Sequence, residues 1–182
     1  MKNSQKKIIL LIIVSLALPI SQCTLIEEDI DGELSTTIPV NETQQGTNID
    51  YEDSQILSAD SDKDISDNLD KIKSWDVQKI SYSIMGFKDD PSITFSGSVG
   101  FSRRNENSPS ITASVSNLEF AKITDNGKKY KISLSDTDLA KIASIFDSDQ
   151  AIKVYWKGVL SQGPMSCSVK VYAKVKVRAK LF

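Results

Sequence analysis

Five cationic side chains near the end of the chain have the types and spacing to bind an anion. They fall on one side of a strand predicted over residues 167–181, because successive side chains of a strand point to opposite faces. Lysine is a flexible point charge, which suits diffuse anions such as lipid headgroups, polyanionic sugars or an acidic protein. The same side chains could instead form a solvated face that prevents edge-to-edge pairing, or contact acidic residues of this chain. These candidate residues are Lys170, Lys174, Lys176, Arg178 and Lys180.

The opposite face of this strand is apolar from Cys167 to Leu181. Cys167 continues that face and is therefore predicted to be a buried structural thiol. A nucleophilic cysteine needs a neighbouring base, and the chain contains no histidine. The lack of histidine also removes the Ser-His-Asp arrangement and the commonest zinc ligand. We expect a protein that is not an enzyme and uses no cofactor, with a hydrolase that uses carboxylates or lysine as the alternative.

Acidic residues at alternate positions, Asp60, Asp62 and Asp64, match the first positions of a calcium-binding loop. An EF-hand loop also has glycine at its sixth position and glutamate at its twelfth. This chain has Ile65 and Lys71 there, so no metal site is predicted. The acids are better explained as residues at the start of a helix, where the helix dipole favours negative charge.

The first residues have the composition of a secretory signal. Lysines at positions 2, 6 and 7 precede an apolar run over residues 8–20. This run of about 13 residues is shorter than the roughly 20 that a membrane-spanning helix needs. We therefore predict that residues 1–22 are a signal peptide.

The signal segment closes with Ile20, Ser21, Gln22 and Cys23. These residues resemble the lipobox of bacterial lipoproteins in its loose, spirochaete-like form, with Ile20 in place of leucine and Gln22 in place of a small residue. The resemblance is limited to this segment and implies that Cys23 carries the lipid. Two or more acyl chains give stable anchoring. It also implies a cell-envelope location, with the outer membrane expected, on its periplasmic or surface face.

Charge is distributed unevenly along the remaining chain. Residues 24–74 contain 14 acidic and 3 basic residues, whereas residues 75–182 contain 10 acidic and 16 basic residues. Because residues 23–55 are mostly polar and acidic, we predict a solvated tether there. An alternating set within this segment indicates one strand as the alternative: Leu34, Thr36, Ile38 and Val40.

Residues 56–182 have the pattern of one mainly β domain. Apolar and polar side chains alternate in short runs, and turn signals such as Asn126-Gly127 separate them. One apolar face per strand suits two packed antiparallel sheets, so we predict a β-sandwich that is immunoglobulin-like in general architecture. Two short helices are expected, one starting at Asp64 or Ser66 and one capped by Ser135. The clearest predicted strands include residues 80–84, 93–101, 111–115 and 152–160.

Together these patterns predict a lipid-anchored envelope lipoprotein that acts as a non-enzymatic binding or interaction module. The expected partners are the membrane, through the N-terminal lipid, and an anionic lipid, a polysaccharide or a protein, through the basic face. Nucleic acid is not an expected partner. The alternative is a purely structural envelope lipoprotein without a specific ligand.

Overall fold

One antiparallel sheet organises the structure, a computed structural model that describes residues 27–180. The strand order is β4-β3-β6-β2-β5, and β1 pairs with the remaining side of β6. Strands β1 and β6 are much longer than the others, and they pair with each other along their whole length. The strands are β1 (Glu27–Ser58), β2 (Ile72–Met85), β3 (Thr94–Ser102), β4 (Ile111–Glu119), β5 (Tyr130–Lys131) and β6 (Ala151–Lys180).

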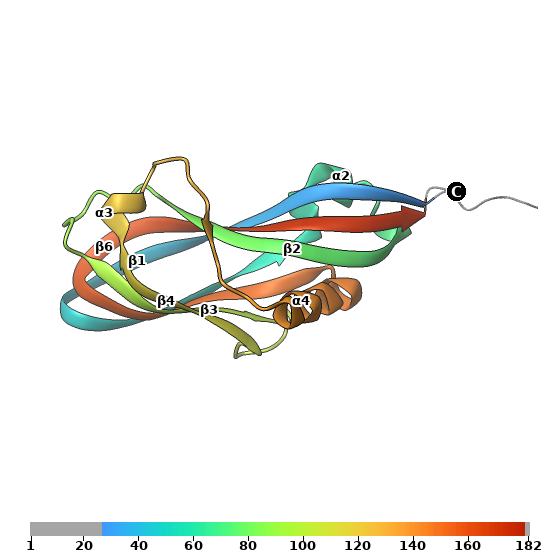
Figure 1. The fold of residues 1–182 in the computed structure, drawn as a ribbon. Helices are drawn as coiled ribbons and strands as arrows, with labels where there is room; N and C mark the ends of the chain where they lie inside the picture. The colour runs from blue at the N-terminus through green and yellow to red at the C-terminus, as the bar shows by residue number, and fades with distance from the viewer. Residues whose placement is uncertain (1–26, 181–182) are drawn as a thin grey trace, which may run out of the picture.

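The pair formed by β1 and β6 folds back on itself. Its register shifts between Glu42 and Gly46, opposite the segment that contains Gly163. On the other side of β6, β2 pairs with its C-terminal half and β3 with its N-terminal half. The sheet therefore forms two layers that share the two long strands, as their doubled-back ribbons show (Figure 1). We call them the β2 layer, which contains the C-terminal half of β6, and the β3 layer, which contains its N-terminal half. The predicted mainly β, antiparallel sandwich is confirmed in this form.

The core lies between the two layers. Alternate residues of β6 from Cys167 to Ala179 are buried, as the sequence pattern predicts, while Leu181 lies outside the described residues. Trp156 of the β3 layer stacks on Phe95 with ring centroids 4.9 Å apart, and its ring is 5.6 Å from that of Tyr82 in the β2 layer. Such aromatic pairs contribute about 0.5–1.5 kcal/mol beyond the area they bury. This cluster therefore holds the layers together.

The predicted acidic tether is wrong for residues 27–55, which belong to β1. The structure has the alternative, a strand whose side chains at Leu34, Ile38 and Val40 are fully buried. Its acidic residues do not prevent folding because β6 places cations beside them. The part of the tether prediction that covers residues 23–26 lies outside the described residues.

Helical segments cover the ends of the sandwich. The expected helix near Asp64 is present as α2 (Lys63–Ser66), between the 3-10 helices η1 (Ala59–Ser61) and η2 (Leu69–Lys71). The other two helices are α3 (Phe120–Ile123) and α4 (Asp136–Asp149).

Ser135 caps α4 as predicted. Its Oγ accepts a hydrogen bond from the Asp138 amide at 3.1 Å. The Ser135 hydroxyl also donates to the Asp138 carboxylate and holds the pKa of that carboxyl below its ordinary value. On the buried side of α4, Phe146 stacks on Trp75 of β2 with ring centroids 4.9 Å apart. The helix is thereby fixed against the β2 layer.

Two glycines allow β3 and β6 to approach each other closely. Gly97 and Gly158 are direct cross-strand partners, and the Phe95 ring lies beside both. A Cβ on Gly97 would lie 2.5 Å from the Gly158 Cα, and one on Gly158 would lie 2.6 Å from the Gly97 Cα. Since backbone atoms cannot move aside as a flexible side chain can, both positions require glycine.

The substitution Gly97→Ala should lower the free energy of unfolding by about 1–3 kcal/mol, the usual cost of forcing extra atoms into a packed region. Urea unfolding followed by tryptophan fluorescence measures this change. Ser98→Ala, on the next residue of β3, is the matched control and should change stability by less than about 0.5 kcal/mol. Equal stability of the two variants would show that the strands separate at no cost.

Candidate functional site

The five predicted anion-binding residues do share one face of β6, but the face also carries carboxylates. The neighbouring strand β1 places an acidic residue directly opposite four of the five cations. Cross-strand neighbours of opposite charge attract each other and stabilise the pairing of their strands. The pairs are Glu27–Lys180, Asp29–Arg178, Asp31–Lys176 and Glu33–Lys174.

Contacts follow from this register. Arg178 Nε lies 3.1 Å from Asp29 Oδ1, and Asp76 of β2 stands opposite Lys176 on the other side. The second layer repeats the arrangement, since Lys157 Nζ lies 2.7 Å from Glu52 Oε2. The hydrogen bond that Lys157 donates to Glu52, together with the negative charge of that carboxylate, raises the pKa of Lys157.

This arrangement corrects the prediction of an open cationic surface. The register favours one of the three interpretations, contact with the acidic segment of the same chain, and Arg178 forms such an ion pair with Asp29. On the β2 side Lys174 stands opposite Lys79, a like charge. Lys170 has uncharged partners on both strands, Thr37 on β1 and Ser83 on β2. We call the four opposite-charge pairs of β1 and β6 the charge ladder. The charge ladder favours strand pairing over the binding of a diffuse anion.

A tyrosine between two lysines extends this face. Lys129 Nζ lies 4.0 Å from the centre of the Tyr172 ring, and Lys170 Nζ lies 5.3 Å from it. Lys129 also forms an ion pair with Glu33, and the Tyr172 hydroxyl lies 3.2 Å from Ser83 Oγ. Cation–π contacts of this kind stabilise exposed sites by about 0.5–1 kcal/mol. The sequence pattern did not indicate Lys129, because it reaches this face from the turn before β5.

Cys167 is buried, as predicted, and stands opposite Val40 in the register of β1 and β6. Burial, with a smaller contribution from the charge of Asp89, raises the pKa of its thiol to about 12. The thiolate is the reactive form of cysteine, so the folded protein holds Cys167 in its unreactive form near neutral pH.

The acidic residues that resemble a calcium loop have structural roles. Asp62 Oδ1 accepts hydrogen bonds from the amides of Asp64 and Ile65 at the start of α2, at 3.0 and 3.2 Å. Asp62 Oδ2 accepts another from the Glu33 amide on the outer edge of β1, at 2.9 Å. Within residues 27–180, no group of three or more acidic or cysteine side chains is arranged to hold a metal ion.

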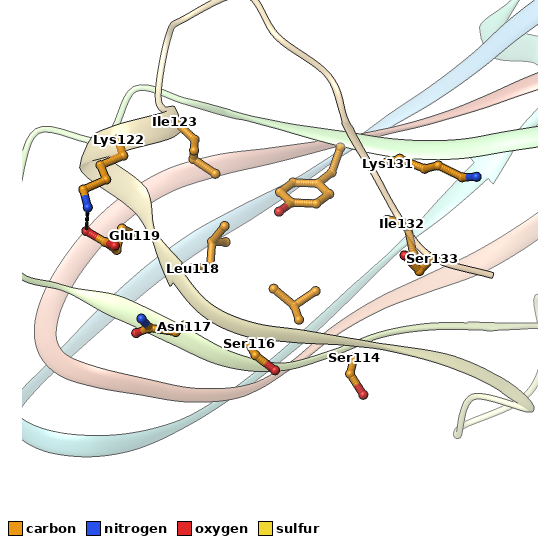
Figure 2. A pocket seen from close by; sticks show the side chains of 12 residues that line it. Ser114, Ser116, Asn117, Leu118, Glu119, Lys122, Ile123, Lys131, Ile132 and Ser133 are labelled. Atoms are coloured by element: carbon orange, nitrogen blue, oxygen red, sulfur yellow. Dashed lines mark ion pairs between the residues drawn. The ribbon is translucent and has the colours of Figure 1, made fainter.

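A cavity lies between the edge of β4 and the segment around β5. It has a volume of about 380 Å³. Leu118, Ile123 and Ile132 line it with apolar side chains, while Lys122 and Lys131 lie toward its rim (Figure 2). Tyr82 contributes from β2, and burial raises the pKa of its phenol so that the ring stays neutral. We call this cavity the β4 cleft.

No sequence pattern indicates the β4 cleft. Residues such as Val115 and Ile132 belong to alternating patterns that indicate a core, and the pattern does not show that two layers stay apart at one edge. Its lining combines apolar groups, hydroxyls and an amide with three charged side chains, Glu119, Lys122 and Lys131.

Comparisons with known proteins place the chain in no family. No family model matches it, and no curated protein matches it. Among solved structures, one of Desmodium yellow mottle tymovirus matches at a TM-score of 0.41 with 13% identity, covering 91% of this chain and 89% of that chain. A structure of Turnip Yellow Mosaic Virus matches at 0.41 with 11% identity, covering 86% and 96%. Similarity at this level supports no statement about function, and the fold rests on its own strand register.

Within residues 27–180, no helix is both long enough and apolar enough to cross a bilayer.

Reversal of one pair tests the charge ladder. Arg178→Glu places like charges beside Asp29 and should lower the free energy of unfolding by up to about 1 kcal/mol, since both side chains are substantially exposed. Adding Asp29→Arg restores the attraction and should recover most of the loss. Urea unfolding at low and high salt measures both effects, and the loss should shrink at high salt. A double variant no more stable than Arg178→Glu would contradict the pairing.

Proposed function

We propose that this protein is a lipid-anchored cell-envelope protein whose folded domain is a non-enzymatic interaction module. The observation that carries the second part is the β4 cleft, an open cavity with an apolar floor and a rim of hydroxyl, amide and charged groups. Sites that recognise a partner combine an apolar centre with a polar rim. The outer membrane is the proposed location.

The partner that this geometry favours is a protein. The cations of β6 have carboxylates of β1 as cross-strand neighbours, which weakens the case for an anionic lipid or polysaccharide on that face. The β4 cleft is lined instead by groups that suit uncharged and apolar side chains. We therefore assign the interaction to the β4 cleft rather than to the cationic residues of β6.

The proposed anchor would hold the domain close to the membrane. Cys23 lies outside the described residues, and only residues 24–26 separate it from the start of β1. At about 3.3–3.6 Å per extended residue, this link can span at most about 10–14 Å. The long flexible tether predicted from composition is thus replaced by a short link, so that a lipid on Cys23 would keep β1 beside the headgroups.

Replacing Cys23 tests the anchor. Cys23→Ala should move the protein from the membrane fraction to the soluble fraction, because the acylated sulfur is lost. Mass spectrometry of the unchanged protein should show an N-terminal Cys23 with added acyl mass. Cys167→Ala, which removes the other cysteine, is the matched control and should remain in the membrane fraction. An unmodified N-terminus elsewhere in the chain would contradict the proposal.

Photo-crosslinking in living cells tests the interaction module. A photoreactive amino acid in place of Ser116, an exposed residue lining the β4 cleft, should give an adduct with another protein. The same group in place of Thr37, an exposed residue of β1, is the control and should give none. The lack of an adduct from Ser116, with normal protein levels, would contradict an interaction through the β4 cleft.

A further inference from the structure

We propose that the β4 cleft accepts an extended peptide segment of a partner protein, which pairs with β4 as an additional strand. This inference rests on the proposed function of the domain as an interaction module. It adds the mode of recognition, in which the peptide backbone is bound by the edge of a sheet.

The first support is the unpaired edge of β4. Residues 111–115 pair with β3 in regular register on one side. Among residues 27–180, no strand, loop or side chain forms a hydrogen bond to their other side. An edge strand of this kind presents alternate N–H and C=O groups that an incoming strand can satisfy. The regular stretch is about 17 Å long at roughly 3.4 Å per residue, which matches a strand of ordinary length.

The second support is a contrast with the outer edge of β1. Side chains cover that edge: Asp62 Oδ2 accepts from the Glu33 amide at 2.9 Å, and Ser61 Oγ accepts from the Ser35 amide at 3.0 Å. β1 also carries many carboxylates and a proline, which discourage pairing with another chain. β4 has no charged residue before Glu119 and no proline. Thus one edge is protected and the other is available.

The third support is the floor beside the free edge. Val115 and Ile123 are only half-buried, although both are apolar and line the cleft. Leu118 and Ile132 point toward the same space (Figure 2). In an added strand, every second side chain would point toward this floor and the others toward solvent. The expected peptide therefore alternates apolar and polar residues.

The pairing stretch ends at a bulge. The register of β3 and β4 shifts between Phe95 and Gly97, and the Asn117 amide donates to Ser96 Oγ at 2.9 Å. Asn117 has a φ of 49°, in the left-handed region. Because this backbone departs from a regular strand, the peptide should pair with residues 111–116 and leave the ladder at Asn117.

Charge at the rim favours an acidic residue in the peptide. Lys122 is already in an ion pair with Glu119 at 2.6 Å. Lys131 is exposed, and it forms no ion pair within residues 27–180. A carboxylate in the peptide that reaches Lys131 would gain an attraction without displacing an existing partner. A second copy of this chain fits less well, because the free edge of its own β4 has no acidic residue before Glu119 to pair with Lys131.

The probe is a series of fluorescein-labelled nine-residue peptides in which Val, Ile, Leu or Tyr alternate with Ser, Thr or Asp. Binding to the full-length protein in detergent micelles is followed by fluorescence anisotropy. Peptides of the same composition in blocks, without alternation, are the control. Alternating peptides should bind, and hydrogen exchange should slow at residues 111–116 when they do. Equal binding of both sets would overturn the proposal.

A proline scan over residues 112–116 tests the backbone pairing. Proline removes an amide donor, and successive strand amides point to opposite edges. Proline at positions whose amides bond to β3 should lower the melting temperature. At the alternate positions it should leave the melting temperature nearly unchanged and weaken peptide binding by about tenfold, which is one lost hydrogen bond of roughly 1.4 kcal/mol. Retained binding in every stable proline variant would overturn strand addition.

Lys131→Glu provides a second variant that leaves β4 intact. It should weaken the binding of Asp-containing peptides by about two- to fivefold, the usual range for an exposed ion pair, and leave peptides without Asp nearly unchanged. One pair of results separates the two proposals. If Ser116 gives crosslinks in cells but no alternating peptide binds, strand addition is overturned and the proposed interaction module is retained. If hydrogen exchange at residues 111–116 slows as the protein concentration rises, with no peptide present, the edge binds a second copy of the chain instead of a peptide.

Discussion

The register of β1 on β6 is the constraint on which the rest of the structure depends. Each side of β6 is used: β1 occupies one side throughout, and β2 and β3 divide the other. A shift of this pairing by one residue would turn the buried valines of β6 outward and bring its lysines into the core. It would also separate pairs such as Asp29 and Arg178. Burial and charge thus specify the same register.

The two-layer shape follows from where the long pair bends and from what fills the space between its halves. Close approach at Gly97 and Gly158 leaves room for the Phe95 ring, which packs on Trp156. Trp156 in turn contacts Tyr82 of the opposite layer. The β2 layer is joined to α4 through Trp75 and Phe146 at another point. The layers part at the β4 edge, which is why the cleft opens there.

Features that depend on residues close together in the sequence were predicted correctly. The alternation that begins at Cys167 predicts a strand with one buried face, and Ser135 predicts the start of α4; both are present. The strand β1 was harder to predict, because its carboxylates are compensated by cations that lie more than a hundred residues away in the sequence. Composition alone assigns such a segment to solvent. The β4 cleft could not be predicted, since its walls come from β4 and from the segment around Ile132, and only the tertiary structure brings them together.

The long pairing of β1 with β6, on both sides of its register shift, has a mechanical consequence. A pull on the start of β1, along the strand, would load its hydrogen bonds to β6 in shear. In the layer nearest the pull, many bonds of the ladder would share that load, because they lie across the strand direction. If the pull were opposed at β4, the force would pass through β6 and β3 along bonded strands. A load applied between β1 and β4 would thus be carried by paired strands along its whole path.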